Sequence, residues 1–316
     1  MRVISLLASG TEIIYALGQG HCLVGRSHEC DNPPEAAALP MCSIPAFDTT
    51  VSSGAIDAEV RRRLRTGEPL YHIHTELIEQ LKPDLIISQA HCQVCAVTPD
   101  DVHRAGCRMP AQVLGLSVGS LAGIYDGVRQ IAKALAVPAQ GDLLVKQMAS
   151  RIDAVTAAVA GRAAPSVVLL EWTDPIFAMG NWGPELIEAA GGRPLLGAKA
   201  EHSAAIEWAA VVQADPDVLI IAPCGFDLPR TRSELPRLRS LPHWQELNAV
   251  RAGRVFLADG NRYFNRSGTT VVETVEMLAN ILHGPVAGVP AHAEAWCSCI
   301  PSSQGADAIC AAPAHS

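Results

Sequence analysis

Aromatic residues make up only 4% of this 316-residue sequence and charged residues only 18%, whereas hydrophobic residues make up 49%. So large a hydrophobic fraction excludes a disordered chain. Basic residues are the minority among the charges, 24 against 32 acidic ones, and the net charge of −8 argues against a nucleic acid or an anionic membrane as partner. A small molecule is therefore the expected partner.

Long hydrophobic runs are also lacking, because no stretch approaches the roughly 18 apolar residues of a membrane-spanning helix. The apolar opening MRVISLL has no basic segment before it and continues directly into Ser9, Gly10 and Glu12. We interpret it as a strand, not a signal peptide, and predict a cytoplasmic monomer without membrane insertion. An upstream start would make the protein periplasmic. In a reducing compartment the ten cysteines are expected to be thiols or metal ligands.

Strand and helix patterns alternate along most of the chain, which is typical of parallel sheets. Strands are predicted at residues 2–7, 23–25, 85–88, 111–116, 166–172, 218–222 and 255–258, whereas residues 121–160 have helical spacing throughout. We predict an α/β fold of two Rossmann-like parallel-sheet lobes, residues 1–120 and 162–285, joined by a long helical connector, 121–161. Residues 286–316 lack periodicity and are predicted to be a disordered tail.

An internal repeat supports two similar lobes. GTEIIYALG at 10–18 matches GPELIEAAG at 183–191, and LKPDLIIS at 81–88 matches ADPDVLIIA at 214–222, in the same order. Residues 41–71 are then extra material in the first lobe. Ser9-Gly-Thr-Glu12 has the pattern of a capping box that opens a helix.

The sequence resembles the substrate-binding proteins that serve ABC importers of vitamin B12, haem and iron siderophores. The segments that carry this resemblance are RVISLLASGTEIIYALG, SHECDNP, HCQVCAV, EWTDPIFAMGNWGPELIEAAGG, APCGFDLPRT and RAGRVFLADGNRYFNRSG. It is similar to a cobalamin-binding-like branch of that class. The resemblance implies binding without turnover, cobalamin or a related corrinoid as ligand, and a membrane component of an ABC importer as partner if the protein is exported.

Ligands of parallel sheets bind beyond the carboxyl ends of the strands, so the loops of the two lobes are expected to form a cleft there. The aromatic residues of the second lobe would give flat apolar walls for a planar ligand, and nearby polar groups would orient it. Alternating His72 and His74 are expected to point the same way, unless one neighbours a helix cap and the other is solvated. The predicted ligand-binding residues are Ser9, Gly10, His28, His72, His74, Gln89, Trp172, Asp174, Trp182 and Phe226.

Three cysteines of the first lobe suggest a metal site. Cys92 and Cys95 form C-x2-C, and His28 and Cys30 lie on a preceding loop. Such a set would suit zinc or an iron–sulfur cluster, which makes a cytoplasmic metalloprotein, possibly enzymatic, the alternative function. Equally, these residues could be buried thiols that need no metal.

One hydrolase motif also occurs, since GLSVG at 115–119 matches G-x-S-x-G between a strand and a helix. Ser117 would then be a nucleophile, with Asp217 and His243 among the downstream partners. Two matched halves and a strandless connector do not fit a hydrolase of one lobe, so we predict that the protein is not an enzyme.

Overall fold

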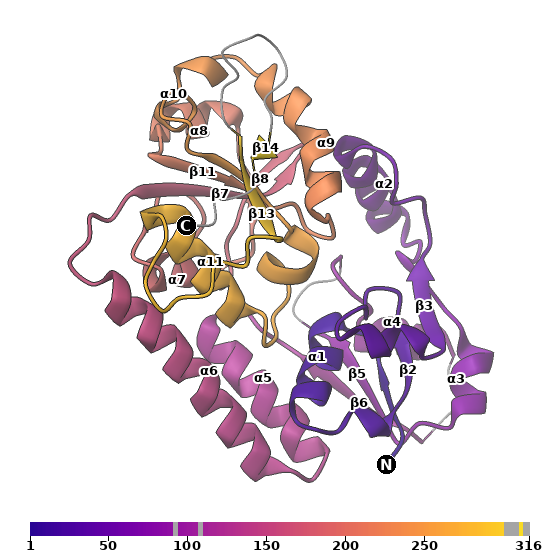
Figure 1. Cartoon of the computed structure of the whole chain (residues 1–316). Coiled ribbons are helices and arrows are strands. Elements are labelled where there is room, and N and C mark those ends of the chain that lie inside the picture. Colours follow the sequence, from indigo (N-terminus) through magenta and orange to yellow (C-terminus); the bar gives the residue numbers. More distant parts are fainter. Residues whose placement is uncertain (91–93, 107–109, 300–309, 312–316) are drawn as a thin grey trace. The chain divides into compact units, whose positions relative to one another are not determined.

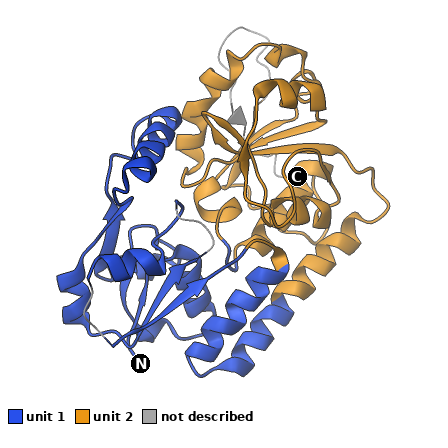
Figure 2. Ribbon diagram, turned by 180° about the vertical axis from the view of Figure 1, so that it is seen from behind, with its two compact units in different colours: residues 1–118, 122–147, 267–269 blue, residues 119–121, 148–266, 270–316 orange. Residues whose placement is uncertain are grey.

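The structure is a computed structural model that describes residues 1–90, 94–106, 110–299 and 310–311. Figure 1 labels its elements, and Figure 2 colours its two compact units. Unit 1 comprises Met1–Val118, Ala122–Gln147 and Ser267–Thr269, and unit 2 comprises Gly119–Leu121, Met148–Arg266 and Thr270–Ser316. Among the described residues, no helix combines the length and apolar character needed to cross a membrane.

Unit 1 contains a six-stranded sheet in the order β4-β3-β2-β1-β5-β6. All neighbouring strands are parallel except β3 and β4, which are antiparallel. The strands are β1 Val3–Ser5, β2 Leu23–Ser27, β3 Met41–Pro45, β4 Tyr71–Ile73, β5 Leu85–Gln89 and β6 Gln112–Leu116. Between them lie α1 Ala8–Ala16, α2 Ser53–Thr66, α3 Thr75–Leu81 and α4 Pro99–Arg104, with short 3-10 helices at Gly20–Cys22 and Pro34–Ala38.

Helices cover both faces of this sheet. Ile4 and Ile86 pack in one cluster with Ile78 of α3 and Val102 of α4. On the opposite face α1 approaches so closely that a Cβ at Gly10 would lie 2.9 Å from Ile87 Cγ2. Enclosure on both faces explains why β1 and β5 are continuous apolar runs in the sequence.

Unit 2 contains an eight-stranded sheet in the order β10-β8-β7-β11-β12-β13-β14, with β9 paired to β7. The strands are β7 Ser166–Thr173, β8 Ile176–Ala178, β9 Arg193–Pro194, β10 Ala204–Ala205, β11 Val218–Ile221, β12 Val255–Ala258, β13 Trp296–Cys299 and β14 Cys310–Ala311. The helices are α7 Gly183–Ala189, α8 Trp208–Ala214, α9 Leu228–Arg239, α10 Asn248–Arg251 and α11 Val271–His283, with short helical turns at Trp244–Glu246 and Gly260–Phe264.

The internal repeat is visible in the topology. β2-β1-β5-β6 of unit 1 corresponds to β9-β7-β11-β12 of unit 2, and all neighbours in both sets are parallel. The helices that follow β1 and β7, α1 and α7, contain the two matched Gly-x-Glu segments. The predicted α/β fold with two parallel-sheet lobes is thereby confirmed.

Residues 121–160 are helical, as predicted, and form α5 Leu121–Ala134 and α6 Pro138–Val159. Two local predictions are wrong. Helix α1 begins at Ala8, so the predicted cap Ser9 lies inside the helix, and the N-cap is Leu7, which makes no side-chain hydrogen bond. The segment after residue 285 is not uniformly disordered either, because Trp296–Cys299 forms β13, which pairs with β12.

A buried carboxylate ties that C-terminal segment to two helices of unit 2. Glu276 on α11 accepts hydrogen bonds from Arg151 on α6 at 2.8 Å and contacts His292 Nε2 at 2.8 Å. Burial alone would raise the pKa of Glu276, but the hydrogen bonds from His292 and Arg151 outweigh it and hold that pKa below its usual value. Nearby, Asn280 donates to the carbonyl of Pro290.

The Glu276 network predicts a loss of stability on neutralisation. Glu276→Gln removes a buried, paired charge and should lower the free energy of unfolding by about 3 kcal/mol at pH 7. Because the folded-state pKa is depressed, the stabilisation exists above the unfolded pKa and disappears as the pH falls through the folded one. Urea unfolding at pH 7 and pH 3 measures both effects. Glu246→Gln, at an exposed glutamate, is the control, and an equal loss in both variants would contradict the prediction.

Candidate ligand-binding site

In unit 1 the loop after β2 contains His28 and Cys30. The ring of His28 lies 5.7 Å from the ring of Tyr71, and its buried Nδ1 has no hydrogen-bond partner among the described residues. Burial is the main cause that lowers the pKa of His28, so the imidazole is neutral at pH 7. A neutral imidazole can accept a hydrogen bond or coordinate a metal ion.

Ser9 and Gly10 have packing roles in the structure. The side chain of Ser9 is buried and its hydroxyl lies 3.3 Å from that of Ser267. Gly10 lacks a Cβ where α1 contacts the sheet. Neither residue offers an accessible surface in this structure, and their role in ligand binding stays a prediction. Gln89, by contrast, is half-buried at the end of β5, and its role stays a prediction.

Cys30 behaves as a buried thiol. Its sulfur accepts a hydrogen bond from Thr11 at 2.9 Å, lies 3.2 Å from the hydroxyl of Ser27, and donates to the carbonyl of Ser5. Burial raises the pKa of Cys30, which disfavours the thiolate that zinc or an iron–sulfur cluster requires.

The proposed three-cysteine metal site is not found where the structure can test it. Among the described residues, no group of three or more His, Cys, Asp and Glu side chains is placed to hold a metal ion. Cys95 is exposed, and Cys92 lies outside the described residues. For Cys30 the alternative of a buried thiol accounts for every contact of its sulfur.

His72 and His74 do not act together. Both are exposed, but His72 lines a hollow of about 690 Å³, whereas His74 precedes α3 and lines a different one. The strand ends at Ile73 and His74 occupies the N-cap position of α3, which fits the alternative that one histidine neighbours a helix cap and the other is solvated. The larger hollow is also lined by Arg63, Glu68, Tyr71, Asp101 and Arg104.

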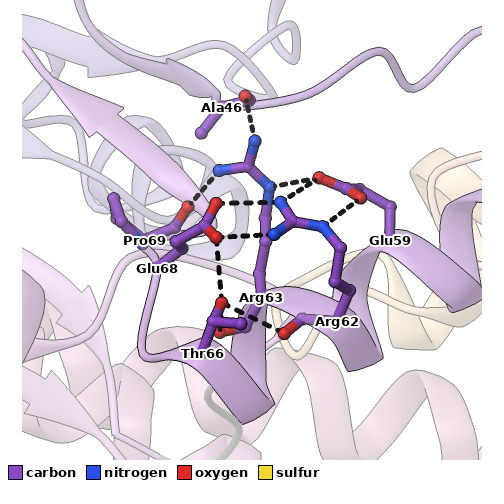
Figure 3. Close-up of polar contacts among 7 residues, drawn as sticks. All are labelled: Ala46, Glu59, Arg62, Arg63, Thr66, Glu68 and Pro69. Carbon is purple, nitrogen blue, oxygen red and sulfur yellow. Dashed lines mark hydrogen bonds and ion pairs between the residues drawn. The ribbon is translucent and has the colours of Figure 1, made fainter.

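One wall of this hollow is fixed by an ion-pair network at the end of α2, drawn in Figure 3. Arg62 bridges Glu59 and Glu68, and its hydrogen bonds lower the pKa of each carboxyl to about 2. Arg63 donates to the carbonyls of Ala46 and Pro69. No sequence signal indicates this arrangement, because the four charged residues have the pattern of an ordinary solvated helix surface.

In unit 2 an aromatic pair stands at the carboxyl ends of the central strands. The ring of Trp172, from the end of β7, lies 5.1 Å from that of Phe226, from the loop after β11. The guanidinium of Arg230 on α9 lies 4.5 Å from the centroid of the Phe226 ring. Phe226 is almost fully buried whereas Trp172 is half-buried, so Trp172 supplies the accessible aromatic surface.

Asp174 is next to this pair and is partly exposed. It forms an ion pair with Arg237 of α9, with Nη2 2.6 Å from Oδ1. Asp174 is a predicted site residue, whereas Arg230 and Arg237 are not, because a helix more than 50 residues further along the chain gives no local sign of which strand end it contacts.

Trp182 is expected from the sequence to face the ligand, a role that stays a prediction. Its side chain is buried, and its indole Nε1 donates to the carbonyl of Phe264 at 3.0 Å. Trp182 therefore packs inside unit 2 at the start of α7. Trp208 is a packing residue as well, since it stacks on Trp244.

The hydrolase alternative lacks its proton relay. Asp217 accepts hydrogen bonds from the backbone and hydroxyl of Ser166, and His243 pairs with Glu246. Asp217 and His243 each bind another partner and do not contact each other. Asp217 therefore does not orient His243 as a general base that could activate Ser117.

Comparison with known proteins agrees with the fold. The profile of the periplasmic binding protein family matches residues 3–261, so the chain belongs to that family. The chain is 24% identical to the uncharacterized ABC transporter substrate-binding lipoprotein YvrC of Bacillus subtilis, over 89% of this chain and 80% of that protein. The family and this relative are substrate-binding proteins, not enzymes.

Solved structures share the architecture. A periplasmic heme-binding protein from Pseudomonas aeruginosa is 19% identical, with a TM-score of 0.71 over 96% of this chain and 99% of that one. The vitamin B12 binding protein BtuF of Vibrio cholerae is 20% identical, with a TM-score of 0.62 over 89% and 96%. At these identities the likeness shows the fold.

The contrast between Cys30 and Cys95 predicts unequal alkylation. Cys95 is exposed, whereas Cys30 is buried with a raised pKa, so iodoacetamide at pH 7.5 should modify Cys95 at least about tenfold faster. Peptide mass spectrometry over a time course measures both rates, and labelling in urea gives the unfolded control. Equal rates in the folded protein, or stoichiometric zinc that Cys30→Ala abolishes, would contradict the buried-thiol interpretation.

Proposed function

We propose that this protein binds a metal chelate of the cobalamin type, through loops at the carboxyl ends of its parallel strands, and releases it unchanged. The observation that carries the proposal is the half-buried Trp172, which stands at the end of β7 over Phe226 and beside charged residues of α9. A flat apolar surface with polar groups at its rim suits a large planar ring with polar substituents.

The relatives support the ligand class. Solved structures of the same fold include proteins described as binding vitamin B12 and heme. In unit 1, neutral His28 can supply a ring nitrogen to the metal of such a ligand, and Gln89 can supply an amide. His72 would contact only a ligand large enough to reach the hollow that it lines.

Delivery to the membrane component of an ABC importer is the biological role that follows from the family. The cytoplasmic location stays a prediction from the sequence, with the periplasm as its alternative. Fractionation of cells that carry the chain with a C-terminal tag distinguishes the two locations.

Calorimetric titration with cobalamin, cobinamide, haem and a ferric siderophore tests the ligand. We expect at least one of them to bind, and Trp172→Ala to weaken that binding about tenfold because a stacking surface is lost. Trp208→Ala is the matched control, since Trp208 packs on Trp244. If the wild-type protein binds none of the four at about 100 μM, the ligand class is wrong.

A further inference from the structure

Helix α9 turns three charged side chains toward the end of β7. Arg230, Glu234 and Arg237 are spaced four and three residues apart, which places them on one face of the helix. Glu234 is buried, and Arg230 approaches it at 3.5 Å, whereas Arg230 and Arg237 are partly exposed. Charge is thus brought into the structure where the neighbouring strand ends.

Two of these side chains hold the turn between β7 and β8. Arg237 donates from Nη1 to the carbonyl of Thr173 at 2.6 Å and pairs through Nη2 with Asp174. The hydroxyl of Thr173 donates to Glu234 at 2.8 Å. Since Thr173 pairs with Ile176 across the hairpin, the turn itself consists of the two residues between them.

The turn between β7 and β8 orients the indole of Trp172. Its Nε1 donates to the carbonyl of Asp174 at 3.0 Å, so the plane of the ring depends on where the turn lies. The ring of Phe226 lies against the guanidinium of Arg230, and its backbone carbonyl accepts a hydrogen bond from the backbone N–H of Asn261. Helix α9 therefore contributes contacts to both members of the aromatic pair, through Arg237 and the turn for Trp172 and through Arg230 for Phe226.

We infer that Arg237 is a positioning residue for ligand binding: through the carbonyl of Thr173 and the carboxylate of Asp174 it holds the turn between β7 and β8, so that Trp172 presents its accessible face to the ligand. This inference rests on the proposed function and names a determinant of affinity outside the strand-end loops. Arginine suits the role because its planar guanidinium serves two acceptors at once, whereas the ammonium of lysine is a point charge.

The placement of Trp172 can be tested without any ligand. The chain has five tryptophans, so 5-fluorotryptophan labelling should give five ¹⁹F resonances, and Trp172→Phe assigns the one of interest. We expect Arg237→Met to shift or broaden that resonance and leave the other four in place. Arg237→Lys should do the same, since charge alone does not restore both contacts.

The binding test uses the same variants and the probe that the wild-type protein binds best among cobalamin, cobinamide, haem and a ferric siderophore. Arg237→Met and Arg237→Lys should each weaken binding by roughly tenfold, because residues of one polar network are energetically coupled. The melting temperature of both variants should stay unchanged. Arg232→Met is the control on the same helix, since Arg232 contacts Cys297 instead, and it should bind as the wild type does.

Three results would overturn the inference: an unmoved Trp172 resonance in Arg237→Met, wild-type affinity in that variant, or full rescue by lysine. A wild-type protein that binds none of the probes refutes the proposed ligand class instead. In that case the ¹⁹F spectra still decide whether Arg237 positions Trp172.

Discussion

Strands β1, β5, β7 and β11 have no face toward solvent, and the remainder of the molecule depends on this constraint. Val3 and Ile4 of β1 and all four residues of β11 are completely buried. Their backbone groups pair within the sheets, so polar side chains can stand only where the strands end. Within each sheet the parallel strands end at the same edge. In unit 1 this edge carries His28 and Cys30, and in unit 2 the corresponding edge carries Trp172 and Asp174.

Helices add the charges that these edges lack. In unit 2 the face of α9 brings Arg230, Glu234 and Arg237 to the end of β7, and in unit 1 the end of α2 fixes the segment that precedes β4. In unit 2 the helix that holds the strand end lies 64 residues away in the sequence, as Arg237 and Thr173 show, whereas in unit 1 α2 lies just before the segment that it holds. Such partners rigidify a binding surface without contacting the ligand themselves.

Periodicity and turn signals were sufficient to predict seven of the fourteen strands that the structure describes, and among these β12 matches its predicted range and β5 and β6 differ by one residue. They were sufficient because a strand buried on both faces is an apolar run between helix ends. Roles of side chains were harder to predict. Trp182 and Trp172 both follow strand or turn signals in the sequence. Trp182, however, is buried and donates a hydrogen bond to the carbonyl of Phe264, 82 residues away. The partner of Asp174 was missed for the same reason, because long-range contacts leave no mark in a local pattern.

The C-terminal segment shows where composition misleads. Rich in Ala, Ser and Pro, it reads as a tail, yet β13 adds an antiparallel strand to β12 and brings Cys297 and Cys299 into the core of unit 2. An added strand needs only alternate apolar residues and a neighbour with unpaired backbone groups, so four residues suffice. Because the family profile ends at residue 261, the sheet edge and the Glu276 network that anchors it are features of this chain beyond that match. Unit 2 thus owes part of its core to residues that follow the family match.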